Sequence, residues 1–248
     1  MKNNPFEAHN IEHLSPSSIN TWIQDPCYWI LTYLFNKRSK SNVSALRGIA
    51  LEKYYADYLT KKIKFMRDSE LHNQFNQLLV ENHYNIEDGI KETSHLTRML
   101  NNLAQNFKSK EPEAYQHKIE VHFEDCPVPI IGYIDFIFKD KIVDLKSTTR
   151  MPRVQSEANN RQMTLYGMAV PHKKLELFYV SQLTTNTFYV VDTDYYKQQI
   201  YATIMGLTKF LSISSNRYEL ASFFTPNFDD WKWSEEMKNE ATKIWRSL

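Results

Sequence analysis

One stretch of this chain limits the possible folds more than any other: an apolar strand, a short charged turn and a second apolar strand. Residues 130–138 (Ile-Ile-Gly-Tyr-Ile-Asp-Phe-Ile-Phe) are rich in the β-branched and aromatic residues that favour strands. Lys139-Asp140-Lys141 is typical of a tight turn, and residues 142–146 are expected to form the next strand. The pattern predicts an antiparallel hairpin.

The segments around this hairpin predict an α/β protein. Ser15 can cap a helix that carries Pro16 in its first turn. The hydrophobic periodicity and the stop signals predict further elements, in chain order: helices over 45–59 and within 68–108, a strand over 117–123, the hairpin, a helix over 156–170, strands over 175–183 and 187–191, and helices over 194–213 and 235–245. The core order is therefore α-β-β-β-α-β-β.

The composition excludes several classes of protein. Of 248 residues, 42% are hydrophobic and 24% charged, so the chain can form a packed core and is not a disordered protein. It has five glycines, none of them in a Gly-rich phosphate-binding pattern. The net charge is +1, so a nucleic-acid partner would need a local basic groove.

The cysteines and the start of the chain predict a cytoplasmic protein. Cys27 and Cys126 form no CxxC motif and no disulfide framework, and free thiols suit a reducing compartment. The opening MKNNPFEAHN has no apolar signal core, and no segment approaches the roughly 18 apolar residues of a membrane span. We therefore expect no membrane partner.

Charged residues on the hairpin predict a metal site. Asp144 and Lys146 are two residues apart on one strand, so they share a face, and a short turn brings Asp135 near Asp144. Two adjacent carboxylates repel each other, and a divalent cation such as Mg²⁺ or Mn²⁺ removes that repulsion. The alternative is a set of surface ion pairs. The strongly apolar strands favour the metal site, because an unpaired charge is costly there.

These residues resemble the core of the PD-(D/E)XK nuclease superfamily, and in particular its RecB-like branch. That branch includes CRISPR-adaptation, AddB-type and mitochondrial genome-maintenance exonucleases. The similar segments appear in the family's order between residues 14 and 166, separated by an insertion at about 61–114: Leu14-Ser15-Pro16-Ser17-Ser18-Ile19 with Pro26-Cys27, Arg47-Gly48-Ile49-Ala50-Leu51-Glu52, Gly132-Tyr133-Ile134-Asp135, Ile142-Val143-Asp144-Leu145-Lys146-Ser147 and Gln162-Met163-Thr164-Leu165-Tyr166.

The resemblance implies a restriction-endonuclease-like αβββαβ core with a mixed central sheet, plus N-terminal and inserted helices. It implies a single nuclease domain over 1–248. Within it we expect a helical N-terminal part over about 14–110, a catalytic core over about 44–60 and 115–192, and C-terminal helices over 194–248.

The resemblance also implies roles for site residues. Asp135 and Asp144 would bind the metal, together with the backbone carbonyl of Leu145. Lys146 would position and polarise the attacking water. Gln162 and Tyr166, one helical turn apart, would border the site and touch the substrate or the water.

The chain departs from the branch at two places. Glu52 stands where the branch usually has His; a carboxylate there can bind a hard cation, and the alternative is a solvent-facing Glu paired with a Lys. Many members hold a 4Fe–4S cluster. Cys27 could be its first ligand, but no cysteine follows Cys126, so a Cys₄ cluster cannot form. We expect packing of Trp231 and Trp233 to hold the C-terminal segment instead.

The implied activity is that of a metal-dependent deoxyribonuclease, most commonly an exonuclease acting at DNA ends, often on single strands, in recombination, repair or replication. Basic residues near the site are candidates for phosphate contacts: Arg47, Arg150, Arg153 and Arg161. Two alternatives stay open. One is a structure-specific endonuclease of the same fold, and the other is a non-catalytic DNA-binding or assembly subunit.

Overall fold

The structure is a computed structural model, and it describes residues 4–107, 111–230 and 232–248. The chain divides into two compact units. One unit comprises Met1–Ser39, Ile119–Gly132 and Asp192–Leu248, and the other comprises Lys40–Lys118 and Tyr133–Val191. We describe each by itself. The expectation of a single nuclease domain over 1–248 stays a prediction.

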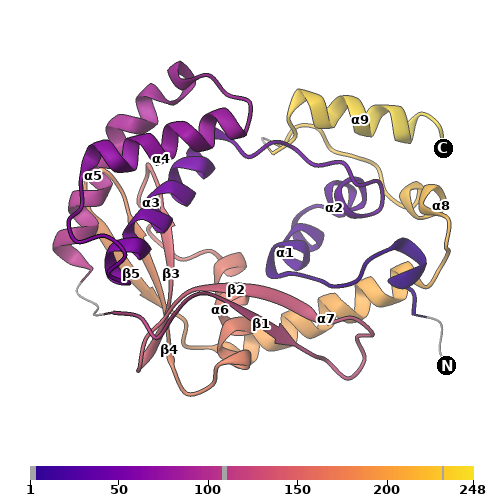
Figure 1. Cartoon of the computed structure of the whole chain (residues 1–248). Coiled ribbons are helices and arrows are strands. Elements are labelled where there is room, and N and C mark those ends of the chain that lie inside the picture. The colour runs from indigo at the N-terminus through magenta and orange to yellow at the C-terminus, as the bar shows by residue number, and fades with distance from the viewer. Residues whose placement is uncertain (1–3, 108–110, 231) are drawn as a thin grey trace. The chain divides into compact units, whose positions relative to one another are not determined.

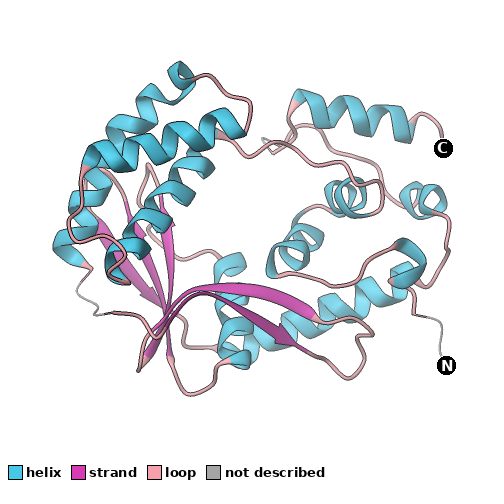
Figure 2. Cartoon of the chain, viewed as in Figure 1, coloured by secondary structure: helices cyan, strands magenta, loops and turns pink. Residues whose placement is uncertain are grey.

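The second unit contains the central sheet (Figures 1 and 2). Its five strands follow one another in the order β1-β2-β3-β4-β5. The strands are β1 (Ala114–Val121), β2 (Ile130–Ile137), β3 (Lys141–Ser147), β4 (Lys174–Val180) and β5 (Thr185–Tyr189). The chain passes from one unit to the other within β1 and again within β2.

The strand pairing is mixed. β2 and β3 are antiparallel, with Phe136 opposite Val143, and β3 and β4 are parallel, with Asp144 opposite Leu177. β4 and β5 are antiparallel. The crossover from β3 to β4 is made by α6 (Glu157–Ala169), as a parallel pair requires. The expected αβββαβ core with a mixed sheet is therefore confirmed.

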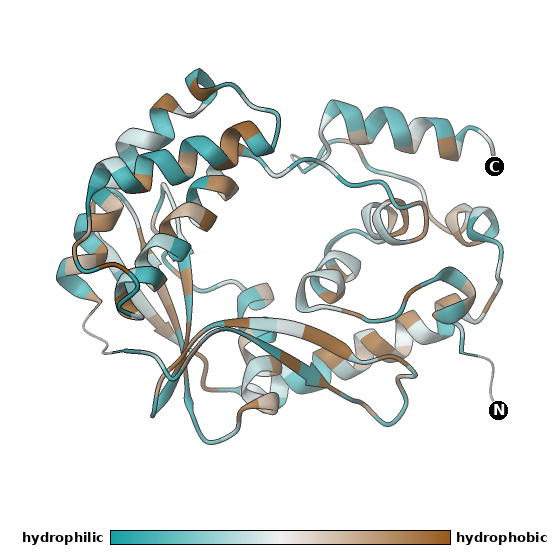
Figure 3. Ribbon diagram, viewed as in Figure 1, coloured by the Kyte–Doolittle hydropathy of each residue, from teal (hydrophilic) through white to brown (hydrophobic). Residues whose placement is uncertain are grey.

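Three helices pack on one face of this sheet: α3 (Val43–Leu59), α4 (Asp68–Glu81) and α5 (Ile90–Asn106), with the short 3₁₀ helix η2 (Ile86–Gly89) before α5. Hydrophobic and hydrophilic residues alternate along α4 and α5 (Figure 3), as expected of helices with one buried face. Their buried side chains form one core with alternate strand residues, among them Phe136, Val143 and Leu145. Because side chains alternate along a strand, Asp144 and Lys146 lie on the other face of β3.

The first unit is mainly helical. It contains η1 (Glu7–His9), α1 (Pro16–Gln24), α2 (Pro26–Tyr33), α7 (Thr193–Leu211), α8 (Arg217–Ser222) and α9 (Glu235–Trp245). The Ser15 side chain accepts a hydrogen bond from the backbone N–H of Ser18, so it caps α1 as predicted. Among the described parts of the chain, no helix combines the length and apolar composition that a membrane-spanning segment requires.

The segment after Asp25-Pro26 is helical, which the aromatic-rich sequence did not indicate. Asp25 ends α1, and its side chain also accepts from the backbone N–H of Tyr28 and caps α2. The indole of Trp233 donates to the same carboxylate at 2.9 Å and lies 5.0 Å from the ring of Tyr28. Trp233 thus anchors the C-terminal segment of this unit, as expected; Trp231 lies outside the described residues.

Candidate active site

The charged residues of the β2–β3 hairpin meet as the strand pattern predicts. Asp135 is 8% exposed and Asp144 is 1% exposed. Asp135 Oδ2 accepts a hydrogen bond of 2.9 Å from the backbone N–H of Leu145. The Lys146 Nζ lies 2.7 Å from Asp144 Oδ2. Two buried carboxylates and one ammonium group therefore occupy the same end of the hairpin.

Helix α6 adds two polar side chains to this group. The Gln162 amide donates to Asp144 Oδ1 at 2.8 Å and to the Tyr166 hydroxyl, also at 2.8 Å. Gln162 and Tyr166 are four residues apart, so they lie on one face of α6. Tyr166 is buried, whereas Gln162 is partly accessible. The structure thus brings both residues to the carboxylate that they were expected to border.

Helix α3 contributes Glu52. The amide of Gln116, on β1, donates to Glu52 Oε1 at 2.6 Å and to Asp135 Oδ1 at 3.2 Å. Glu52 thus faces the hairpin carboxylates, and it is not simply a solvent-facing partner of a lysine. Sequence reasoning missed Gln116. No motif marks it, because its place depends on the local backbone of β1.

The carboxylates of Glu52, Asp135 and Asp144 share a largely buried space, which changes the pKa values of the groups there. Burial raises the pKa of Asp135 well above its ordinary value, and the charges of Asp144 and Glu52 add to this. Burial and Asp144 also raise the pKa of Glu52. Burial by itself would lower the pKa of Lys146, but Asp144 and Asp135 raise it to about 12. Lys146 therefore keeps its proton at neutral pH.

The chemistry of these donors fits a hard divalent cation, since carboxylate oxygens are the ligands that Mg²⁺ prefers. The buried Asp144 Oδ2 lies 2.7 Å from the Lys146 ammonium, and no other donor within the described residues reaches it. In the same part of the chain, no three His, Cys, Asp or Glu side chains are already arranged around one point as a ligand set. The Gln162 amide and the Lys146 ammonium engage Asp144 instead, so cation binding at Asp144 would require these two side chains to shift.

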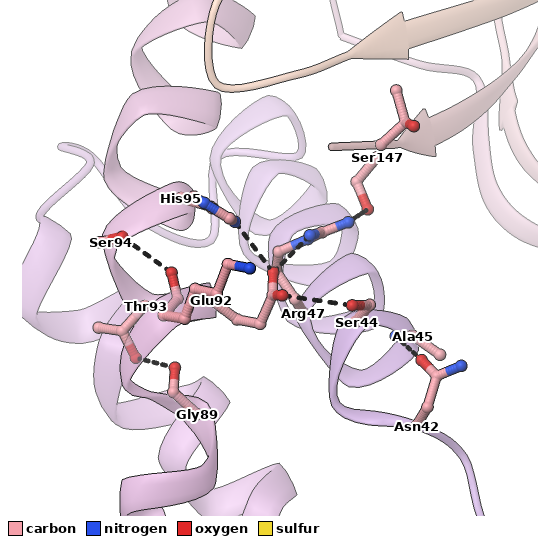
Figure 4. Close-up of polar contacts among 12 residues, drawn as sticks. Asn42, Ser44, Ala45, Arg47, Gly89, Glu92, Thr93, Ser94, His95 and Ser147 are labelled. Carbon is pink, nitrogen blue, oxygen red and sulfur yellow. Dashed lines mark hydrogen bonds and ion pairs between the residues drawn. The ribbon is translucent and has the colours of Figure 1, made fainter. Parts of the chain in front are cut away.

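Arg47 lies in the interior, not on a groove. It is 2% exposed, and its guanidinium pairs with Glu92 Oε2 at 2.5 Å. The same guanidinium reaches the Ser147 hydroxyl at 3.4 Å, and Glu92 also contacts Ser44 and His95 (Figure 4). Arg47 therefore joins α3 to α5 and to the end of β3. In this position it cannot contact a phosphate directly.

The other three candidate arginines differ in exposure. Arg161 is 5% exposed and pairs with Glu157 at 3.4 Å. Arg150 and Arg153 are exposed, and both belong to the segment between β3 and α6. Of the four, only Arg150 and Arg153 present their side chains to solvent close in sequence to Lys146.

A comparison with protein-family models identifies the family of this chain. The family model of the PD-(D/E)XK nuclease superfamily matches residues 13–244. The chain belongs to the PD-(D/E)XK nuclease superfamily.

Several solved structures are similar to this chain. One is a protein from Eubacterium rectale provisionally assigned as an exonuclease; it has a TM-score of 0.54 and 11% identity, over 96% of this chain and 92% of that chain. This likeness supports the fold. The second, SSO0001, has a TM-score of 0.32 and 14% identity over 74% of this chain and 85% of that chain, too low to bear on the fold. None of the curated proteins matches the chain.

Proposed function

We propose that the protein is a divalent-metal-dependent exonuclease that hydrolyses phosphodiester bonds at the ends of DNA. The observation that carries this proposal is the buried group formed by Asp135, Asp144 and Lys146, with Gln162 bound to Asp144. Membership of a nuclease superfamily supports the nuclease class. The name given to the Eubacterium rectale protein favours an exonuclease.

Glu52, Asp135, Asp144 and the carbonyl of Leu145 would hold Mg²⁺ or Mn²⁺. When bound, the metal would activate water and offset the charge that develops on the phosphate. Because its pKa is raised to about 12, Lys146 would stay protonated and act as a fixed positive charge, not as a general base. Its ammonium would orient the attacking water and stabilise the phosphate oxygens. Gln162 would fix the orientation of Asp144 through its amide.

Arg150 and Arg153 are the proposed phosphate contacts, because both are exposed. Arg47 and Arg161 would act indirectly, by holding α3 and α6 in place. The substrate would be DNA with a free end, with single strands as one form. The protein would act in recombination, repair or replication in the cytoplasm of a prokaryotic or phage-infected cell.

The direct test compares end-labelled linear DNA with circular DNA in Mg²⁺ or Mn²⁺. The proposal predicts degradation of linear DNA only. Cleavage of circles would instead indicate the endonuclease alternative, and binding without turnover would indicate a non-catalytic subunit. Oligonucleotides labelled at the 5′ or the 3′ end, single- and double-stranded, would then give the polarity and the strand preference.

Two substitutions test the site. Asp144→Asn should abolish cleavage, and Lys146→Ala should lower kcat by about 100-fold or more, because each removes a charge needed in the transition state. Both variants should retain the fold by circular dichroism and should still bind DNA. Asp140→Asn, on the exposed turn of the same hairpin, is the matched control and should cleave normally. Unchanged turnover in both site variants would refute the assignment.

A further inference from the structure

Gln116 has an unusual backbone conformation. Its φ is 48°, within the left-handed region that side chains other than glycine rarely adopt, although it lies within strand β1. The other non-glycine residues with positive φ in the described parts of the chain (Asn10, Asn36, Lys61, His83 and His172) all lie in turns or loops outside the strands. Such outliers persist where the surrounding structure enforces them, often at functional sites.

The conformation changes where neighbouring side chains point. In a regular strand, consecutive residues face opposite sides of the sheet. The ring of Tyr115 packs against Phe136 on the core side, whereas the amide of Gln116 reaches the carboxylates of Glu52 and Asp135. Gln116, His117 and Lys118 are all exposed, so the usual alternation is interrupted at this point. A local break of this kind redirects one side chain, as β-bulges near active sites do.

The redirected amide joins two elements. Its nitrogen lies 2.6 Å from Glu52 Oε1, on helix α3, and 3.2 Å from Asp135 Oδ1, on strand β2. An amide NH₂ group has two hydrogens, one for each carboxylate, and each carboxylate retains further lone pairs. The amide therefore offsets the repulsion between the two acids and leaves them able to bind a cation.

We propose that Gln116 is a positioning residue that holds Glu52 beside Asp135, so that the helix carboxylate can bind the same metal centre as the hairpin carboxylates. This inference rests on the proposed function. It assigns Gln116 no contact with the reacting atoms. Without its amide, Glu52 is free to turn toward solvent, and metal affinity falls.

The test uses Gln116→Asn and Gln116→Gly in the full-length protein. Both residues tolerate a positive φ, but neither side chain can bridge the two carboxylates. Mn²⁺ binding is measured by titration calorimetry without DNA, and cleavage is measured over a range of Mn²⁺ concentrations. We expect Mn²⁺ affinity to fall about 10- to 100-fold, the usual effect of losing a group that orients a metal ligand. High Mn²⁺ should restore most of kcat, and the KM for DNA should change little.

His83→Gly is the matched control. His83 also has a positive φ and lies in the exposed turn after α4. Its Mn²⁺ affinity should equal that of the wild type. If the wild type binds Mn²⁺ and cleaves DNA, but the Gln116 variants bind Mn²⁺ equally well, the positioning role is wrong and the nuclease proposal stands. If high Mn²⁺ fails to restore cleavage, the positioning role is also wrong. If the wild type binds no Mn²⁺, both proposals fail.

Discussion

The guanidinium of Arg47 is a buried charge with a defined set of partners. It pairs with Glu92, which also contacts Ser44 on α3 and His95 on α5. Removing one partner of a buried pair leaves the other charge uncompensated, whereas replacing both with apolar residues is often tolerated. Arg47 lies five residues before Glu52 on α3, so the main effect of this network is to fix the helix that carries Glu52.

The first prediction concerns this pair. Arg47→Met should reduce the free energy of unfolding by about 3–5 kcal/mol, because Glu92 stays buried without its cation. The double variant Arg47→Met/Glu92→Met should lose clearly less. Urea unfolding of the wild type, Arg47→Met, Glu92→Met and the double variant measures these differences. A double variant as unstable as the sum of the two single variants would show that the residues act independently.

The same pair gives a pH dependence. Burial would raise the pKa of Glu92, but the Arg47 guanidinium and His95 outweigh it and lower that pKa below the ordinary 4.5. A lowered folded-state pKa means that stability is present above the unfolded-state pKa and is lost as pH falls through the folded value. Wild-type stability should therefore decline below about pH 4.5 more steeply than that of Arg47→Met/Glu92→Met. Identical acid limbs would contradict this.

Two glycines, one in each unit, differ in the space around their Cα atoms. A Cβ on Gly89, at the start of α5, would overlap Leu79 Cδ1 and lie 3.0 Å from Phe75 Cε1. A Cβ on Gly206, within α7, would meet nothing within 4 Å. The junction of α4 and α5 is therefore closely packed, whereas the exposed side of α7 has space for a methyl group.

We predict opposite effects on the free energy of unfolding when alanine replaces each of these two glycines. Gly89→Ala should lower the free energy of unfolding by about 1–3 kcal/mol through overpacking. Gly206→Ala should raise it by about 0.5–1 kcal/mol, because alanine favours a helix interior. Chemical denaturation of both variants checks this. A neutral or stabilising Gly89→Ala would mean that the α4–α5 junction can relax.

Sequence patterns predicted the elements that carry the strongest local signals. The Ser15 cap, the β2–β3 hairpin and the Ser156-capped helix α6 all form as expected. Helix α2 was missed, because its aromatic residues and the preceding Asp25-Pro26 resemble a break more than a start. Gln116 was missed because glutamine has no preference for positive φ, so its position follows from the packing around β1.

At the scale of the molecule, the candidate site carries an electrostatic cost that a bound cation would relieve. Three carboxylates lie together, and burial and mutual repulsion raise the pKa values of Asp135 and Glu52. Functional sites often reduce stability in this way. A ligand that binds only the folded protein then stabilises it according to its affinity and concentration.

Metal binding should therefore raise the thermal midpoint. At a concentration about 100 times its Kd, Mn²⁺ should stabilise the protein by about 2.7 kcal/mol, or about 5–10 °C for a chain of this size. Asp144→Asn should show little or no shift, and Asp140→Asn should respond like the wild type. An equal shift in Asp144→Asn would place the metal elsewhere.

The most direct measurement is a crystal structure of the wild-type protein with Mn²⁺, using anomalous diffraction to locate the ion. We predict an anomalous peak in direct coordination with Asp135, Asp144 and the carbonyl of Leu145, with Glu52 turned toward it and Lys146 beside it. A bound ion remote from these residues, or carboxylates that stay apart with no peak between them at saturating Mn²⁺, would contradict it.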